Sequence, residues 1–183
     1  QLVREVATKT NDAAGDGTWS TYYKWLNNIR EMEKEAVKLN VVNYQAVSIT
    51  LRSWIYQLLT DAFGNVPMTE ACRGDEQLFT PKFDTQEDIY HTLIDDLATA
   101  NTLFDTKTGL KYNTTADMLY KASSTDATGM LKWKKFCNSL RMRILMRVID
   151  VDGFNAAAEL KTMIDDPTTY PVFTSNEDAA MLS

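Results

Sequence analysis

The residues able to carry out acid–base or nucleophilic chemistry are few and form no recognisable catalytic set. The only histidine, His91, has Asp88 and Asp95 three residues before and four residues after it, so these side chains share one helical face. That pattern matches no metal motif, and there is no second histidine to complete one. A solvated polar face is the favoured interpretation. The two cysteines, Cys72 and Cys137, have no histidine beside them in the sequence. We therefore expect no catalytic residue and no metal site.

Nucleotide-binding patterns are also missing from the sequence. Neither GxxxxGK[ST] nor GxGxxG occurs, so no phosphate-binding loop is predicted. The many carboxylates could include a catalytic pair, but no feature of the sequence singles one out. We expect a protein without enzymatic activity and without a cofactor.

Trp19 is the residue best placed to bind a ligand. It stands where the polar stretch TNDAAGDG (10–17) meets a helical pattern, and an indole can stack on the flat face of a sugar ring. Asn11, Asp12 and Asp16 precede it and carry groups that bond sugar hydroxyls. The alternative is a hydrophobic staple, in which Trp19 packs on the first helical turn. The candidate ligand-binding residues are therefore Trp19, Asn11, Asp12 and Asp16.

Positive charge is concentrated in the fourth predicted helix. Six basic residues precede its first acidic residue, Asp150, and they are Lys132, Lys134, Lys135, Arg141, Arg143 and Arg147. They are spread around the helix, whereas a nucleic-acid site needs them aligned on one surface. The net charge of −6 also argues against a nucleic-acid binder, whose affinity would depend on Lys and Arg that neutralise phosphates. We expect a packing helix whose charges pair with acidic neighbours, and no nucleic-acid partner.

Apolar residues recur at three- and four-residue steps and predict five helices. These helices run from Trp19 to Asn40, over 44–62, from Asp84 or Thr85 to Phe104, from Leu131 to Val151, and over 154–164. A short helical end over 1–8 and an extended tail after Pro171 complete the prediction. The first two long helices are joined by a few residues, so they should form an antiparallel hairpin. The apolar stripe of the second is wide, which indicates burial on more than one side.

Turn residues mark the boundaries of these helices. Asn43 is a candidate N-cap for the second helix. Gly64 suits the left-handed position just past a helix end, and Val66, which precedes Pro67, is expected to be extended. The segment 72–83 is predicted to be a loop or a short strand.

Composition places the chain among soluble helical proteins. Of its 183 residues 44% are hydrophobic and 24% charged, enough for one or two domains with a real core. No run approaches the ~20 apolar residues of a membrane-spanning helix. The opening QLVREVATKTND is polar, so no signal peptide is predicted, and two cysteines do not define a disulfide framework. Paired helices of this size suggest tetratricopeptide-like stacking, although no strict 34-residue repeat is visible.

Two blocks of sequence carry more specific information. The first joins LRSWIYQLLTDAFGNVPMTEA (51–71) to PKFDTQEDIYHTLIDDL (81–97), and the second joins DMLY (117–120) to KWKKFCNSLRMRI (132–144). Both resemble the SusD/RagB family of outer-membrane glycan-binding lipoproteins. In that family a long helix ends in a Gly-Asp-Val-Pro-like turn before a P-K-[FY]-D-[ST]-Q-E-x-I-Y helix start. A D-x-[IL]-Y … K-W-x-K-F-A-N-S-L-R-x-R block then follows.

Three departures from the family pattern are visible. Asn65 replaces the usual Asp, Cys137 stands where Ala is typical, and ASSTDATGM (122–130) is slightly lengthened. The motifs are scaffold motifs, so they identify the family without supplying a ligand residue. The ligand role of Trp19 therefore depends on local chemistry alone.

The resemblance implies a mostly α fold of tetratricopeptide-like helix hairpins with long loops. Residues 1–183 are expected to be a single partial domain, the N-terminal and central part of a longer SusD-like protein. The implied ligand is an oligosaccharide, or a peptide as in some relatives, delivered to a SusC-like TonB-dependent transporter. The implied location is the external face of the outer membrane, through a lipid anchor that this chain does not carry. A helical-repeat module for protein–protein interaction remains the alternative.

Overall fold

The computed structural model describes residues 17–112 and 117–179, and this part of the chain is helical. Its α-helices are α2 (Thr18–Lys38), α3 (Val42–Phe63), α4 (Gln86–Leu103), α5 (Thr128–Arg147) and α6 (Ala156–Asp165). Two short 3-10 helices are η1 (Gly74–Glu76) and η2 (Asn176–Asp178), the second within the tail predicted to be extended. Pairing between extended residues is limited, in the described ranges, to one isolated bridge between Val66 and Asp84. The predicted helical end over 1–8 lies outside the described residues.

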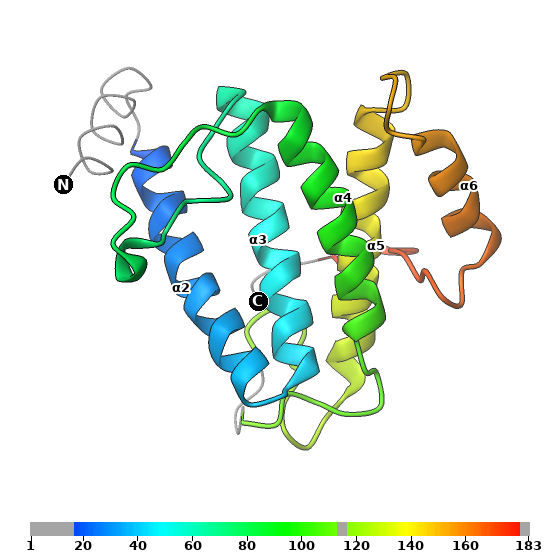
Figure 1. Cartoon of the computed structure of the whole chain (residues 1–183). Coiled ribbons are helices and arrows are strands. Elements are labelled where there is room, and N and C mark those ends of the chain that lie inside the picture. Colours follow the sequence, from blue (N-terminus) through cyan, green and yellow to red (C-terminus); the bar gives the residue numbers. More distant parts are fainter. Residues whose placement is uncertain (1–16, 113–116, 180–183) are drawn as a thin grey trace.

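The helices from α2 to α5 run alternately up and down, and α6 lies beside α5 (Figure 1). Each helix packs mainly on its neighbours in the chain, and α3 also contacts α5. Only residues 39–41 separate α2 from α3, which explains why these two helices form an antiparallel pair. The prediction of mostly α, tetratricopeptide-like helix hairpins with long loops is confirmed.

One continuous hydrophobic core connects all five helices. Its most deeply buried members include one apolar side chain from each helix: Leu26, Leu59, Leu93, Ile144 and Met163. Removing each such side chain from water contributes about 1.5–3 kcal/mol to the free energy of unfolding before entropy is considered. The amphipathic pattern of the sequence is therefore the main reason that the helices associate.

The central position of α3 confirms the burial predicted from its wide apolar stripe. It packs on α2, α4 and α5, so its polar residues are also enclosed. Ser48 Oγ donates to Tyr44 O at 2.8 Å, and Thr50 Oγ1 donates to Ala46 O at 2.8 Å. A hydroxyl group in a buried helix can donate a hydrogen bond to the carbonyl four residues earlier. This bond offsets the free-energy cost of removing the hydroxyl from water.

The boundaries of α5 differ from the prediction. The sequence pattern suggested 131–151, whereas the helix spans Thr128–Arg147. Beyond its end, Val148 N–H donates to Leu145 O at 3.2 Å and Val151 N–H donates to Val148 O at 3.0 Å. These three-residue turns replace helical hydrogen bonds although apolar residues continue, so periodicity alone placed both ends of the helix three to four residues too late.

The prediction that Asn43 caps α3 is wrong. The residue before the helix is Val41, which offers no side-chain cap, and Asn43 is buried inside the first turn. Asn43 Nδ2 donates to Asp105 O at 2.9 Å and to Thr108 O at 2.8 Å, while Asn43 Oδ1 accepts from Asp105 N–H at 2.9 Å. Its amide serves the loop after α4 because that loop lies against the start of α3.

The connection from α3 to α4 is ordered by backbone pairing. Gly64 ends α3 with a φ of 71°, and its N–H donates to Thr60 O at 2.9 Å. Val66 is then extended, and Asp84 N–H donates to Val66 O at 3.1 Å. The extended geometry at Val66 is confirmed. Gly64 has the expected positive φ, but its ψ of −119° places it outside the left-handed helical conformation that was predicted.

The side chain of Asp84 holds the turn that follows Pro67. Its carboxylate is buried and accepts from the backbone N–H groups of Met68 and Thr69, each at 2.8 Å, and from Thr69 Oγ1 at 2.8 Å. Burial alone would raise the pKa of Asp84, but the hydrogen bonds from Thr69 and Met68 and the charge of Lys82 outweigh it and lower the pKa. The ionised carboxylate is therefore the form that the fold requires.

Because Asp84 is engaged in this turn, the cap of α4 is supplied by its neighbour. The sequence left two possible starts for this helix, Asp84 and Thr85. Thr85 Oγ1 accepts from Asp88 N–H at 3.1 Å, so the helix is capped by Thr85.

Replacing Asp84 by Asn is expected to lower the free energy of unfolding by about 2–3 kcal/mol at neutral pH, because an amide accepts less strongly and offers only one acceptor oxygen. The folded-state pKa is lowered, so the difference between the two proteins is complete above the unfolded pKa of about 4. It should shrink as the pH falls through the folded-state pKa. Urea denaturation between pH 7 and pH 3 measures it.

The exposed Asp95→Asn serves as the matched control for Asp84→Asn and should change stability by less than about 0.5 kcal/mol. A stability difference for Asp84→Asn that stayed constant down to pH 3 would show that its charge is not what holds the turn.

The loop between α4 and α5 is held by close backbone packing. Leu110 N–H donates to Ser123 O at 3.0 Å, and the adjacent Gly109 lies directly against Ser123 O. Gly129 in the first turn of α5 lies against Ala122 N, which a Cβ atom at position 129 would approach to 2.7 Å. Neither glycine leaves room for a side chain because the opposing atoms belong to the backbone.

The substitutions Gly109→Ala and Gly129→Ala are each expected to lower the free energy of unfolding by about 1–3 kcal/mol, since backbone must move to admit a methyl group. Gly74→Ala is the control, because its nearest atom would be Phe79 Cε1 at 3.9 Å, an ordinary contact. Thermal denaturation of the three variants checks this. Equal stability of all three would contradict the close packing of the 105–127 loop.

Candidate functional site

Trp19, the predicted ligand-binding residue, is buried among other aromatic rings. Only 3% of it is exposed, and its ring centroid lies 5.0 Å from that of Tyr23, 5.1 Å from Phe63 and 6.5 Å from Phe83. No wide indole face is open to a sugar ring, so this geometry favours the alternative role of Trp19 in packing. Asn11, Asp12 and Asp16 lie outside the described residues. The ligand role of the four residues stays a prediction.

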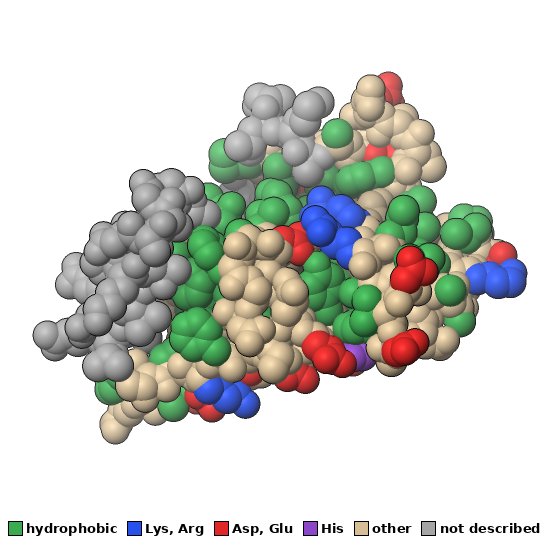
Figure 2. All heavy atoms as spheres, turned by 90° about the horizontal axis from the view of Figure 1, so that it is seen from above, with side chains coloured by type: hydrophobic (Ala, Val, Ile, Leu, Met, Phe, Trp, Pro, Cys, Tyr) green, Lys and Arg blue, Asp and Glu red, His purple; other side chains and the backbone are tan. Residues whose placement is uncertain are grey.

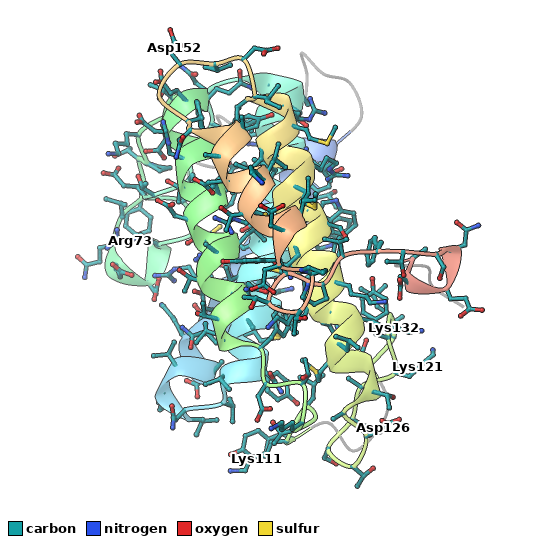
Figure 3. All side chains as sticks on the ribbon, turned by 90° about the vertical axis from the view of Figure 1, so that its right-hand side faces the viewer. Arg73, Lys111, Lys121, Asp126, Lys132 and Asp152 are labelled. Atoms are coloured by element: carbon teal, nitrogen blue, oxygen red, sulfur yellow. The ribbon has the colours of Figure 1, made fainter. Side chains whose placement is uncertain are left out.

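The polar loop after α3 is attached to α2 by ion pairs. Arg30 contacts Asp75 at 2.9 Å and also pairs with Glu76, and Lys34 contacts Asp75 at 2.5 Å. Hydrogen bonds from Lys34 and then Arg30 hold the pKa of Asp75 at about 2. Arg73 adds a contact to Glu76 at 2.5 Å. The loop is thus fixed against α2 at the edge of the molecule labelled by Arg73 in Figure 3.

Arg52 forms ion pairs with two carboxylates and so connects three helices. Arg52 on α3 contacts Glu33 of α2 and Asp96 of α4, both at 2.8 Å. Burial raises the pKa values of Glu33 and Asp96, and the arginine opposes this effect. Raised carboxyl pKa values also occur at acid–base catalytic sites, but here both groups are joined to Arg52 and connect helices. This arrangement has the geometry of a structural bridge.

Neither cysteine has the environment of a reactive thiol. Burial raises the pKa of Cys72 to about 11 and that of Cys137 to about 12, so both thiols are protonated at neutral pH. Cys137 is fully buried. His91 is not the fully solvated residue expected from the sequence, because the ring of Phe154 stacks on it at 3.9 Å.

Metal and membrane sites were also sought in the described residues. Within 17–112 and 117–179, no group of three His, Cys, Asp or Glu side chains is positioned to hold a metal ion. In the same ranges, no helix combines the length and apolar character that crossing a membrane requires.

Three of the six basic residues of α5, Lys135, Arg141 and Arg147, pair with acidic neighbours, so the predicted pairing is confirmed in part. Lys135 contacts Asp178 at 2.9 Å, and Arg141 contacts Glu159 of α6 at 2.6 Å. Lys132 Nζ donates to the backbone oxygen of Glu177 at 3.2 Å, beneath the segment that leaves the bundle in Figure 3. These contacts bind much of the positive charge of α5 to groups of its own chain, so little positive charge is left to bind nucleic acid.

A groove lies between the second half of α5 and the segment after α6. Its volume is about 600 Å³, within the range of ligand sites. It is lined by Ser139, Met142, Arg143, Met146, Arg147, Val172 and Phe173. The lining is mostly apolar, and Met146 is 64% exposed. Seen from above, basic side chains lie among hydrophobic ones at the end of the bundle where α5 ends (Figure 2).

The polar side of this groove continues into a hydrogen-bonded cluster around Asp61. The Asp61 carboxylate contacts Arg147 at 2.9 Å and accepts from Gln57 Nε2 at 3.1 Å and from Tyr90 OH at 2.5 Å. Arg143 in turn donates to Gln57 Oε1. Burial and then the Asp61 hydrogen bond raise the pKa of Tyr90 to about 12, so its hydroxyl stays a donor. The cluster orients both arginines along the groove.

The sequence did not predict this groove. The i, i+4 pairs Met142–Met146 and Arg143–Arg147 on one helical face were a signal that could have been found. The opposite wall, Val172 and Phe173, comes from a segment whose path is set by contacts far along the chain.

Comparison with known proteins assigns the family. The SusD-like family, described as "Starch-binding associating with outer membrane", matches residues 5–183. Since this match covers nearly the whole chain, the protein belongs to the SusD-like family. The suspected SusD/RagB membership is confirmed.

Solved structures show the same fold. A SusD homologue from Bacteroides fragilis has 27% identity and a TM-score of 0.70 over 87% of this chain and 32% of its own. A chitin-binding protein has 29% identity and a TM-score of 0.69 over 89% of this chain and 32% of its own. A SusD-like protein of Bacteroidetes has 28% identity and a TM-score of 0.70 over 91% of this chain and 28% of its own. The chain thus spans about a third of the length of these structures. No functionally curated protein matches it.

Two departures from the family motifs leave the scaffold intact. Asn65 Oδ1 accepts from Gln86 N–H at 3.0 Å, and an Asp carboxylate can accept in the same way. Cys137 is fully buried against Leu97 O, where its sulfur lies at 3.4 Å. Both residues fulfil packing or capping roles that the family motif requires.

Trp19→Ala is expected to lower the free energy of unfolding by about 3–5 kcal/mol, because the buried indole is lost from an aromatic cluster. The half-exposed Trp25 provides the control, and Trp25→Ala should cost less than about 1 kcal/mol. Urea denaturation compares them. Ligand titration of Trp19→Phe, which keeps an aromatic ring, distinguishes the roles: unchanged affinity removes Trp19 from the ligand site, and a large loss of affinity at near-normal stability retains it.

Proposed function

We propose that the protein captures glycans at the external face of the outer membrane without catalysing a reaction. The observation that carries this proposal is the match of residues 5–183 to a family described as starch-binding and associated with the outer membrane. A chitin-binding protein with 29% identity supports the same class of ligand. The protonated thiols and the arginine-bound carboxylates of the described residues are consistent with a binding protein.

Glycan recognition requires aromatic faces and hydrogen-bonding groups near the surface. The described part of the chain presents four half-exposed aromatic side chains: Trp25, Phe79, Phe83 and Tyr112. Trp25 lies 5.6 Å from Tyr22, so the two rings form a pair on α2. These residues are the available stacking surfaces, whereas Trp19 supports the fold beneath Phe83.

Delivery of the bound glycan to a SusC-like TonB-dependent transporter, and attachment through a lipid anchor, belong to the same proposal. They derive from the family, and the long helical scaffold is a suitable platform for holding one ligand surface while contacting a protein partner. The single-partial-domain organisation of residues 1–183 remains a prediction.

A second candidate function is peptide binding by a helical-repeat scaffold. The groove beside α5 favours it, because Met142, Met146, Val172 and Phe173 make its lining mostly apolar. Apolar pockets with a few placed charges suit peptide side chains better than sugar hydroxyls.

Isothermal titration of the intact protein against a panel of oligosaccharides and peptides tests the proposal. We expect saturable binding of at least one oligosaccharide, in the micromolar to millimolar range, about −4 to −8 kcal/mol. For that sugar, alanine substitution of the half-exposed aromatic residue that stacks on it should weaken binding about tenfold, with little change in unfolding temperature. Binding of peptides alone would favour the second candidate, and hydrolysis of any sugar would contradict the non-catalytic role.

A further inference from the structure

The outer face of α5 consists of two halves that differ in what covers them. The first half presents Lys132, Lys135 and Ser139, and the segment 170–178 lies across it. The second half presents the methionines and arginines that line the groove, and this groove is open. Figure 3 shows the segment leaving the end of α6 and passing α5 near Lys132.

The covered half shows which kinds of side chain bind to α5. Phe173 N–H donates to Ser139 Oγ at 2.9 Å, and the Phe173 ring stacks on Phe136 with parallel planes 6.1 Å apart between centroids. Five residues later, both oxygens of Asp178 accept from Lys135 at 2.9 Å. The segment 170–178, which ends in the 3-10 helix η2, is therefore held by an apolar side chain, an acidic side chain and its own backbone.

The open half repeats the same combination of groups on the same helix. Met142 and Met146 supply the apolar surface, and Arg143 and Arg147 supply the positive charge. Arg147 pairs with Asp61, whereas Arg143 has no carboxylate within 4.0 Å among the described residues and bonds only to the neutral Gln57. Two cations face one anion there, on a chain whose net charge is −6.

We infer that the groove of Met142, Arg143, Met146, Arg147 and Phe173 binds an extended segment of a partner protein that carries apolar and acidic side chains. Charge complementarity favours this occupant, because a partner carboxylate would pair with Arg143. Continuity favours it too, since the groove prolongs a surface on which such a segment already docks. The inference goes beyond glycan capture and does not depend on it.

A glycan fits this groove less well. Ser139 Oγ already accepts from Phe173 N–H, and Arg147 and Arg143 are engaged by Asp61 and Gln57. The rest of the lining is apolar and offers no partner for sugar hydroxyls. Methionine-lined surfaces adapt to varied side chains, which is a property of peptide-binding sites.

Fluorescence anisotropy of a labelled decapeptide, YPVFTSNEDA, which copies residues 170–179, tests the inference on the intact protein. We expect saturable binding. The peptide with both acidic residues changed to Lys should bind at least tenfold more weakly, because the pairing with Arg143 is lost.

Protein variants locate the binding to the groove. Arg143→Glu should weaken peptide binding at least tenfold, and Met146→Ser should weaken it several-fold. Both residues are exposed, so circular dichroism should show an unchanged fold. Lys38→Glu, with the same change in charge on the distant helix α2, should bind the peptide as the unchanged protein does.

Three results would overturn the inference. The first is no binding of the peptide. The second is binding that is lost in Lys135→Glu but kept in Arg143→Glu, which would place the peptide on the covered half in exchange with the protein's own segment. The third is a concentration-dependent dimer, seen by ultracentrifugation and abolished by Arg143→Glu, which would make a second copy the occupant. Glycan titration of the same variants remains independent of all three results.

Discussion

The buried carboxylate of Asp84 is the interaction on which the arrangement of the helices depends. It fixes the turn after Pro67 through two backbone N–H groups and a hydroxyl, and the next residue, Thr85, begins α4. The direction in which α4 returns along α3 is thereby decided at one side chain. Tyr23 OH donates to Pro67 O at 2.6 Å, which attaches the same turn to α2. The turn held by Asp84 thus connects α2, α3 and α4 and lies beside the aromatic cluster around Trp19.

The sequence predicted those features that depend on neighbours close in the chain. The five helices, the stop at Gly64 and the inward charge of α5 follow from periodicity, backbone preference and composition. Asn43 was misassigned because its partners, Asp105 and Thr108, lie more than 60 residues away. The groove escaped prediction for the same reason, since Phe173 reaches α5 only through tertiary contacts. Family motifs identified the scaffold, but a scaffold motif carries no information on ligand residues.

The two proposed kinds of recognition, of a glycan and of a partner protein, would use different surfaces of the described residues. Half-exposed aromatic rings lie on α2 and on the loops that follow α3 and α4, where flat sugar faces can stack. The apolar and basic groove lies on α5, two helices away from α2. A binding protein that passes its ligand to a membrane partner needs both a ligand surface and a protein-binding surface. The helical scaffold offers room for each without overlap.

The order of packing has a consequence for how the molecule responds to change. Within the described residues α2 packs on α3, α3 on α4, α4 on α5 and α5 on α6, with one further contact between α3 and α5, while α2 makes no contact with α5 or α6. Such a serial arrangement approximates a one-dimensional array, in which stability is a sum of local units and nearest-neighbour interfaces. In such an array, a structural change at one terminal helix affects mainly the one or two helices next to it. Surface loops can therefore diversify at one end during evolution while the opposite end keeps its shape.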